Sequence, residues 1–466
     1  MKLLKNIDPP KFLLICLIIL VAFVVLQNFK VSKKDYSADL DQLQSFSFSK
    51  VPVLEKKDLE LARFGKQLFF DRRLSANGEV ACVSCHKPEL SFTDGKAVAE
   101  GIGKTTKNTP PLVNVFSGYW FFWDGRADSL EAQALGPIEA SAEHGLDRWR
   151  LANLLKKYYS DEYERNFGPW PEIPKEDPSP KKARNAQLDQ RLAQVAVDTL
   201  RRSLKKEILA KAKEQGVVAS EVFLKEHIEF PATIADSGVS AGVDLIAGNF
   251  ARAIAAFERT IVAVDSPFDN FVNRFSRQDN GDVSEAFGEG FGEDQWLGYQ
   301  LFVGKGQCVL CHNGPSFSDQ QFHNIGSPPA VALQEQTTGV DLGRAIGLLL
   351  AKESAWNCLG KLLPRSESES CRELPYLNTV SQEALGAFKT PTLRNVALTA
   401  PYLHDGSMAS LQEVLEAYNE LRTVARVGHR EETLKPLGFS EKDLWRLEQF
   451  LHALTSPVRV MVDEEP

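Results

Sequence analysis

The stretch Cys82-Val83-Ser84-Cys85-His86 decides how this chain of 466 residues folds, because its pattern returns at Cys308-Val309-Leu310-Cys311-His312. Both stretches read C-x-x-C-H, which is the pattern of c-type haem attachment. The two thiols of such a motif add to the haem vinyl groups, and the histidine that follows binds the iron as its proximal ligand. The sequence therefore predicts two covalently attached haems, with His86 and His312 as their proximal ligands.

Two other kinds of site also use paired cysteines, namely a structural zinc site and a thioredoxin-type redox pair. Four cysteines could share one zinc ion, but both trailing histidines would then be a coincidence. A redox C-x-x-C needs no histidine after it. Haem attachment explains all six of the residues concerned, which are Cys82, Cys85, His86, Cys308, Cys311 and His312.

The motifs belong to a longer internal repeat. Gly65-Lys66-Gln67-Leu68-Phe69 precedes the first motif, and Gly298-Tyr299-Gln300-Leu301-Phe302 precedes the second. Each copy resembles a helix that leads into a haem-attachment loop, so we expect a duplicated haem domain rather than a short solenoid repeat. Strand-like alternation is sparse, and Glu441 to Leu454 has the pattern of a closing helix. The predicted fold is mainly α, with two cytochrome c-like domains and a cleft between them.

The N-terminus carries an apolar segment. Phe12 to Phe29 is an 18-residue run without a charge, which as a helix would span roughly 27 Å, enough to cross a bilayer. Val24 to Phe29 offers no small-residue cleavage site, so we expect an uncleaved anchor, with a cleaved signal peptide as the alternative. Either reading predicts export, with the protein on the periplasmic side of a bacterial inner membrane or soluble in the periplasm.

The expected domains follow from these landmarks. They are an anchor or signal segment (1–35), a linker (36–55), an N-terminal haem domain (56–285) with a basic helical insertion (about 168–230), a C-terminal haem domain (286–455) and a tail (456–466). The formal net charge of -8 argues against a protein built to hold nucleic acid. Lys181 to Lys225 nevertheless carries eleven basic and five acidic residues. This segment is either a solvated helix face or a docking surface for an acidic partner or an anionic membrane.

Cys358 and Cys371 lie in a polar stretch outside the haem motifs. An oxidising compartment would allow a disulfide between them. The alternative is two free thiols in a loop. Residues 327–386, which contain both cysteines, have the composition of an irregular surface loop.

The surroundings of the motifs resemble the bacterial diheme cytochrome c peroxidase and MauG family over most of residues 56–455. The stretches that carry this resemblance are Leu68-Phe69-Phe70-Asp71, Phe122-Trp123-Asp124-Gly125-Arg126-Ala127, Gly136-Pro137-Ile138, Asp265-Ser266-Pro267-Phe268-Asp269, Phe388-Lys389-Thr390-Pro391-Thr392-Leu393-Arg394-Asn395 and Leu398-Thr399-Ala400-Pro401-Tyr402-Leu403-His404-Asp405-Gly406. Lys181 to Lys225 and the segment around Cys358 to Cys371 look like additions to the common core.

The resemblance implies roles for residues near the first haem. In the family this haem meets peroxide, and a tryptophan lies between the two haems, which the match assigns to Trp123. The family's spacing places a glutamine at Gln133, a proline at Pro137 and the acid/base carboxylate at Glu143. Family members commonly carry methionine after that glutamate, whereas this chain has His144, which leaves the polarity of the pocket open and offers another nitrogen near the iron.

The expected axial ligands distinguish the two haems. Between His86 and His144 the chain has no histidine or methionine, so the first haem should be five-coordinate or water-bound. Conventional peroxidases of the family place a methionine fourteen residues after the histidine that corresponds to His404, and here that position is Tyr418; Met408 lies only four residues beyond His404. The resemblance to MauG-like members therefore implies a phenolate ligand on the second iron, which favours ferric and higher states.

Family members also hold a calcium ion between the haems, and the matching positions are Asn108, Thr399 and Pro401. The resemblance as a whole implies a MauG-like oxidoreductase that reacts with hydrogen peroxide and passes oxidising equivalents to an external donor, such as a side chain of a partner protein. The alternatives are a detoxifying cytochrome c peroxidase that is reduced by a small cytochrome, and a diheme electron carrier without enzymatic activity.

Overall fold

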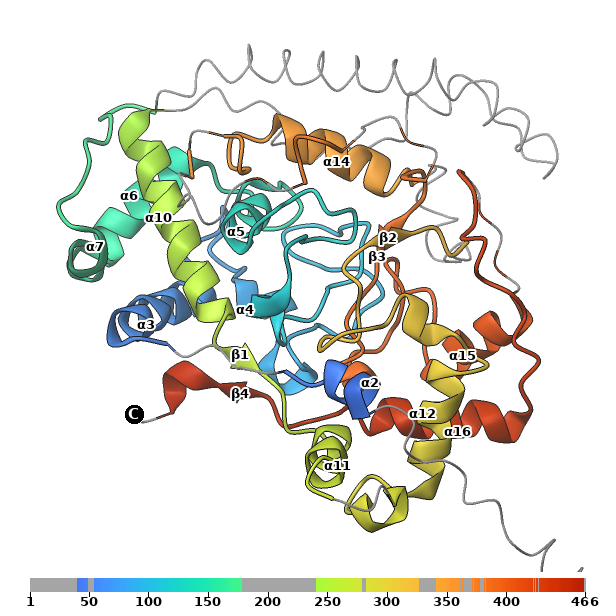
Figure 1. Cartoon of the computed structure of the whole chain (residues 1–466). Helices are drawn as coiled ribbons and strands as arrows, with labels where there is room; N and C mark the ends of the chain where they lie inside the picture. The colour runs from blue at the N-terminus through green and yellow to red at the C-terminus, as the bar shows by residue number, and fades with distance from the viewer. Residues whose placement is uncertain are drawn as a thin grey trace, which may run out of the picture.

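The computed structural model describes most of the two expected haem domains (Figure 1). The described residues are 40–48, 54–177, 240–278, 282–326, 341–360, 362–363, 371, 373–377, 381, 383–421, 423, 425 and 427–464. The apolar segment Phe12 to Phe29 and the basic segment Lys181 to Lys225 lie outside them. Among the helices that are described, none combines the length and the apolar character needed to cross a membrane.

The described part of the chain is mainly α, as predicted. Its α-helices are α2 (Leu40–Ser45), α3 (Lys56–Phe70), α4 (Cys82–Cys85), α5 (Leu130–Glu139), α6 (Arg148–Tyr158), α7 (Ser160–Phe167), α10 (Ala241–Glu258), α11 (Pro267–Phe275), α12 (Glu293–Val303), α14 (Arg344–Glu353), α15 (Leu411–Glu420) and α16 (Glu441–His452). Four two-residue strands form two antiparallel pairs: β1 (Ile261–Val262) with β4 (Arg459–Val460), and β2 (Phe322–His323) with β3 (Phe388–Lys389).

In the first half of the molecule, α3 packs against α10, and α10 also packs against α5 and α6. The closest approach of α3 and α10 is at Gly65, where an added Cβ would lie 1.8 Å from the carbonyl oxygen of Ala253. Glycine is therefore required at this position, since any side chain would push the two helices apart. Phe69 and Phe257, whose ring centroids are 5.0 Å apart, continue this contact into the hydrophobic core.

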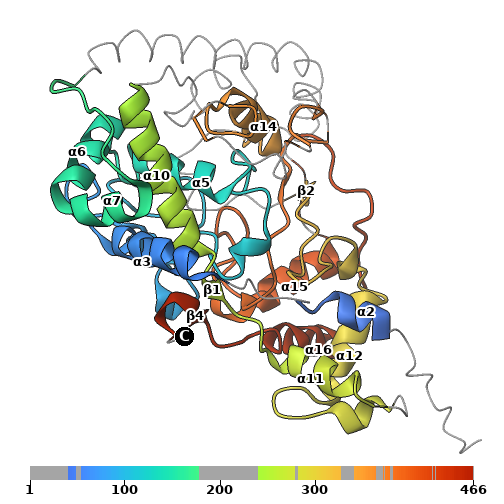
Figure 2. The same ribbon diagram turned by 60° about the vertical axis from the view of Figure 1, so that its left-hand side comes forward.

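The second half repeats this arrangement with α12, α16 and α15. A Cβ added at Gly298 would lie 2.0 Å from the carbonyl oxygen of Arg446, so α12 and α16 meet as closely as α3 and α10 do. Gly65 and Gly298 occupy the same place in the two repeats recognised in the sequence. The two helix groups stand at opposite sides of the molecule in both views (Figures 1 and 2).

The core of the second half includes a helix that lies before residue 285. Helix α11 packs into the core of the second half, through Phe268 and Phe271, although the predicted division at residue 285 assigned it to the first. Ser266 starts this helix, because its hydroxyl accepts a hydrogen bond from the backbone N–H of Asp269. The chain therefore crosses between the halves at the β1 region, just before α11.

Two terminal segments are tied to the body of the molecule. Leu43 and Phe46, in the expected linker, are fully buried in the second core, and a guanidinium nitrogen of Arg394 donates to the carbonyl oxygen of Phe46 at 2.7 Å. The expected tail returns to the first half, where β4 pairs with β1. Both segments bridge parts of the chain that are far apart in sequence.

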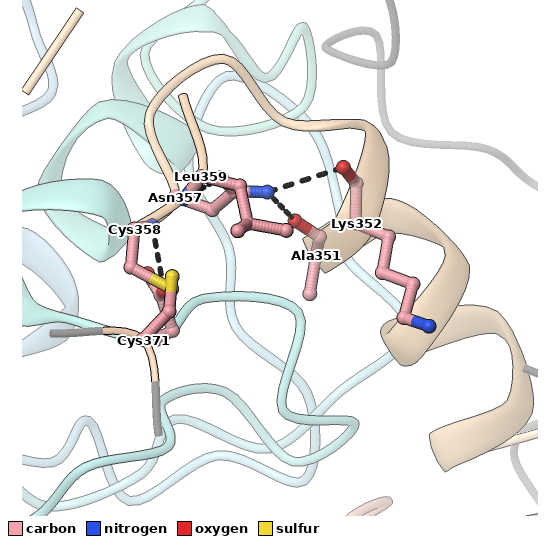
Figure 3. The surroundings of a disulfide bond; sticks show 7 residues. Ala351, Lys352, Asn357, Cys358, Leu359 and Cys371 are labelled. Atoms are coloured by element: carbon pink, nitrogen blue, oxygen red, sulfur yellow. Dashed lines mark hydrogen bonds between the residues drawn. A yellow bond between two sulfur atoms is a disulfide. The ribbon is translucent and has the colours of Figure 1, made fainter. Parts of the chain in front are cut away.

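Residues 341–377 contain helix α14, although the composition of this stretch predicted an irregular loop. Cys358 and Cys371 are joined by a disulfide with a Cα–Cα distance of 5.3 Å, which confirms the bonded alternative (Figure 3). The side-chain amide of Asn357 donates to the carbonyl oxygens of Ala351 and Lys352 and so closes the end of α14. We use the name clasp for the described residues between 341 and 377, in which the backbone N–H of Cys358 donates to Asp128 of the first half at 2.8 Å.

Candidate functional site

The first attachment motif forms helix α4, and His86 follows it directly. The Nδ1–H of His86 donates to the carbonyl oxygen of Phe92 at 2.9 Å. This bond fixes the tautomer and leaves the Nε2 lone pair available to a metal. Burial lowers the pKa of His86, so the imidazole is neutral, as a metal ligand must be.

The second attachment motif has the same local geometry. Its cysteines begin and follow a single 3₁₀ turn, Cys308–Leu310, and the Nδ1–H of His312 donates to the carbonyl oxygen of Phe317 at 2.9 Å. Burial also lowers the pKa of His312. Phe92 and Phe317 both adopt positive φ, 59° and 49°, to turn their carbonyls toward the histidines. Each motif thus offers two thiols and a preoriented imidazole, which is the donor set that a c-type haem requires.

The internal duplication extends beyond the two attachment motifs and the helices that precede them. The side chain of Asn114 accepts from and donates to the backbone of Ala263, at 2.9 and 2.7 Å. Asn395 makes the same pair of bonds to the backbone of Ser456, at 3.0 and 2.9 Å. The signal was present in the sequence as Thr109-Pro110-Pro111-Leu112-Val113-Asn114 and Thr390-Pro391-Thr392-Leu393-Arg394-Asn395.

A tight turn and a helix follow in each half, and they align residue by residue. The turns have positive φ at Phe122 and Leu403, and they are closed by the bridges Phe121↔Ala127 and Tyr402↔Met408. Trp123 of the first turn therefore corresponds to His404 of the second.

The helices after these turns begin at equivalent serines. Ser129 accepts from the backbone N–H of Ala132 to cap α5, and Ser410 accepts from that of Glu413 to cap α15. Counting from the caps, Pro137 in α5 and Tyr418 in α15 are both the eighth residue. A proline ring has no atom that can bind a metal, whereas a phenol has one. The two halves therefore differ in ligand chemistry at an equivalent position.

Tyr418 interacts electrostatically with the second attachment motif. Burial raises the pKa of Tyr418 far above its usual value, and Cys308 and Cys311 act in the same direction. A partly buried phenol that interacts with both attachment cysteines fits the predicted role of axial ligand, since a ferric ion would stabilise the phenolate that burial disfavours.

Glu143 lies in the half of the molecule that carries the first attachment motif. Burial raises the pKa of its carboxyl, while Arg126 acts in the opposite direction. The carboxyl also interacts electrostatically with Cys82 and Cys85, so it lies on the side of the molecule where the first haem is attached. Its backbone is held by the N–H of Ile102, which donates to the Glu143 carbonyl oxygen at 3.0 Å.

Trp123 connects the two halves. Its indole Nε1–H donates to the carbonyl oxygen of Asn108 at 2.9 Å, and its own carbonyl oxygen accepts from the backbone N–H of Lys389 at 2.8 Å. The predicted bridging tryptophan is therefore bonded to segments of both domains. Gln133 lies one helical turn before Pro137 on α5, which places both residues on one face of that helix.

The three predicted calcium ligands also come from both halves. The backbone N–H of Asn108 donates to the carbonyl oxygen of His404 at 2.8 Å, which brings Asn108 to the loop that contains Thr399 and Pro401. The side-chain amide nitrogen of Asn108 donates to the carbonyl oxygen of Lys96 at 2.8 Å, so the amide oxygen remains the acceptor end. An amide oxygen beside a loop of carbonyl oxygens fits the oxygen ligation that calcium prefers.

His144 is buried and His404 is largely buried. The Nδ1–H of His144 donates to the carbonyl oxygen of Leu74 at 2.6 Å, and burial lowers its pKa. The ring of His404 stacks on Phe388 with centroids 3.6 Å apart, and burial lowers the pKa of His404 to about 4. His404 thus packs at the junction of the halves, where its equivalent in the first half is Trp123.

Comparison with known proteins agrees with this geometry. Residues 59–206 match the family described as di-haem cytochrome c peroxidase. The chain is 29% identical over 416 residues to the methylamine utilization protein MauG of Methylorubrum extorquens, covering 87% of this chain and 82% of that protein. It is 29% identical over 430 residues to the cytochrome-c peroxidase IdrP1 of Denitromonas iodatirespirans, covering 89% and 86%. These matches support the predicted resemblance to the diheme cytochrome c peroxidase/MauG family.

A solved structure also supports the fold. The diheme peroxidase BthA from Burkholderia thailandensis matches with a TM-score of 0.55 at 17% identity, over 86% of this chain and 87% of that chain. The names of these relatives are consistent with a peroxidase-type oxidoreductase, and they imply two c-type haems, with hydrogen peroxide and an electron donor as reactants. The residues described above fit both haems, because each half supplies two cysteines and an oriented histidine.

Proposed function

We propose that this diheme protein is a MauG-like oxidoreductase, which reacts with hydrogen peroxide at the first haem and passes the oxidising equivalents through the second to an external donor. The proposal rests on one difference between the two repeats: the first has Pro137 at the position where the second has Tyr418. It leaves the first iron with His86 as its protein ligand and gives the second both His312 and Tyr418. One centre can then bind peroxide while the other is closed to it.

Glu143 acts on the protons of peroxide. As a carboxylate it accepts the first proton, and as the acid it returns that proton to the leaving oxygen, so the carboxyl carries no net proton change. Burial excludes water from the carboxyl and strengthens this exchange, while Arg126 restrains how far the carboxyl pKa rises. Gln133 lies on the face of α5 that also carries Pro137 and orients the peroxide by hydrogen bonding.

Haem supplies the redox chemistry when bound, and the chain determines where oxidising equivalents can go. The indole of Trp123, bonded to both halves, provides the path between them. Tyr418 favours the higher oxidation states of the second iron, as a hard anionic oxygen does. We further propose that Asn108, Thr399 and Pro401 bind calcium, and that the segment Phe12 to Phe29 anchors the protein at the periplasmic face of the inner membrane.

The external donor distinguishes this proposal from a detoxifying peroxidase. The name of the relative IdrP1 favours cytochrome-c peroxidase activity as the alternative. A detoxifying enzyme would accept electrons from a reduced small cytochrome at a high rate. A second haem with a methionine ligand has a higher reduction potential than one with a tyrosine ligand and would accept these electrons more readily.

Stopped-flow mixing of the fully ferric protein with hydrogen peroxide tests the proposal. We expect a reaction without pre-reduction, and an oxidised species that persists until a donor is added. A protein that turns over reduced cytochrome c rapidly, and only after pre-reduction, would be a detoxifying peroxidase. A protein whose spectrum peroxide leaves unchanged would contradict the proposed function altogether.

A further inference from the structure

Tyr119 is an exposed tyrosine that is connected to the second attachment motif. Its side chain is 42% exposed, and it lies four residues before Trp123. The phenol O–H donates to the carbonyl oxygen of Asp319 at 3.2 Å, and the side-chain amide of Gln321 donates to the phenol oxygen at 3.0 Å. Two hydrogen bonds thus hold the exposed phenol against the segment that follows His312.

The connection continues to Cys311. The backbone N–H of Asp319 donates to the carbonyl oxygen of Cys311 at 2.8 Å. The Asp319 carboxylate is fixed in turn by His323, whose Nε2 lies 2.8 Å from it. The backbone of Asp319 therefore connects the phenol to Cys311, a cysteine of the second attachment motif, through one hydrogen bond on each side.

The neighbouring Trp120 is less suited to exchange electrons with solvent. It is buried beneath the clasp, where it packs with Leu348 and Leu374. The Arg344 guanidinium lies 4.0 Å from the centroid of the indole ring and covers it on one side. The clasp thus covers the tryptophan and leaves the adjacent tyrosine open.

We propose that Tyr119 is the surface redox residue through which an external one-electron donor reduces the second haem. The inference rests on the proposed function, which supplies the oxidant: hydrogen peroxide takes two electrons and two protons to give two water molecules. In each relay step Tyr119 gives one electron toward the oxidised second haem and its phenolic proton to water, forming a neutral tyrosyl radical. The donor then returns one electron, and water returns the proton.

The chemistry of Tyr119 fits this role. Burial of part of the ring raises the pKa of the phenol, so the residue is protonated at neutral pH and must lose a proton when it is oxidised. Its exposure gives that proton direct access to water. Donors of matching chemistry are one-electron reductants that reach the phenol edge, such as an oxidisable aromatic side chain of a partner protein.

Tyr119→Phe tests the proposal, because it removes the O–H and keeps the ring. Tyr158→Phe is the matched control, since Tyr158 is 37% exposed and lies on α6 in the first half. We expect the rate of reaction of the ferric protein with peroxide to be unchanged in both variants. Steady-state oxidation of a small phenolic donor should fall at least tenfold in Tyr119→Phe and stay at the wild-type level in Tyr158→Phe.

A second readout does not depend on turnover. Wild-type protein, frozen after peroxide is added without a donor, should give a tyrosyl radical signal in the EPR spectrum that is absent from Tyr119→Phe and present in Tyr158→Phe. An unchanged signal and unchanged donor oxidation in Tyr119→Phe would overturn the proposal. Wild-type protein that does not react with peroxide would instead refute the proposed function on which it rests.

Discussion

Replacement of Glu143 by glutamine should abolish most of the reaction with peroxide. Glutamine has nearly the same shape as glutamate but cannot accept a proton. A positioned acid/base group typically contributes 10²- to 10⁴-fold to rate. Because Glu143 is partly buried and interacts electrostatically with the attachment cysteines of the first half, we expect a loss of at least roughly 10²-fold, or about 3 kcal/mol of transition-state stabilisation.

The pH dependence of the rate of reaction with peroxide provides a second test of the role of Glu143. The carboxylate form of Glu143 is the active base, so the wild-type rate should be lost as pH falls through the pKa of this group. Burial raises that pKa above 4.5, so the loss should be centred above pH 4.5. The glutamine variant should lack this step, because it has no carboxyl to titrate.

The assay is stopped-flow measurement of the second-order rate constant for ferric protein and hydrogen peroxide, between pH 4 and 8. Glu89→Gln is the control, since Glu89 is an exposed glutamate in the same domain. The control should keep both the wild-type rate and its pH profile. A Glu143→Gln protein with haem spectra intact and a wild-type rate constant would refute the acid/base assignment.

Two further predictions concern stability. Hydrogen bonds with Asp319, Cys311 and Glu431 raise the pKa of His323 to about 11, so its ionic bonds to the two carboxylates should stabilise the fold fully below pH 6.5 and lose effect as pH rises toward 11. His323→Gln should cost about 1–3 kcal/mol at pH 6 in urea unfolding and less at pH 10, and equal costs at both would contradict this. Replacing Cys358 and Cys371 by serine should lower the free energy of unfolding by about 3 kcal/mol, as expected for a loop of this size. Reductant should lower the urea midpoint of the wild-type protein to that of the double variant. An unchanged wild-type midpoint would show that the disulfide does not restrain the unfolded chain.

Much of the site could be predicted from the sequence, because its chemistry depends on rare residues at fixed spacing. The two C-x-x-C-H motifs specify attachment and proximal ligation, and the structure orients His86 and His312 identically. Counting from His404 predicts Tyr418 as a ligand, and its phenol interacts electrostatically with Cys308 and Cys311, while the role of ligand stays a prediction. A metal ligand leaves a strong trace in the sequence, since few other residues can replace it.

The parts that were missed depend on contacts between distant segments. No local pattern indicates that α2 packs into the second core, because Leu43 and Phe46 find their partners more than two hundred residues away. Helix α11 packs into the second core for the same reason, although it precedes the predicted division at residue 285. The equivalence of Asn114 and Asn395 was visible in the sequence, but only the paired hydrogen bonds to Ala263 and Ser456 give it a physical meaning.

The account depends most on the difference between the two irons, and an EPR spectrum of the resting ferric protein tests it directly. We predict one high-spin signal from the first haem and one low-spin signal from the second, and Tyr418→Phe should change the low-spin signal alone. Two low-spin signals that both survive Tyr418→Phe would contradict the account.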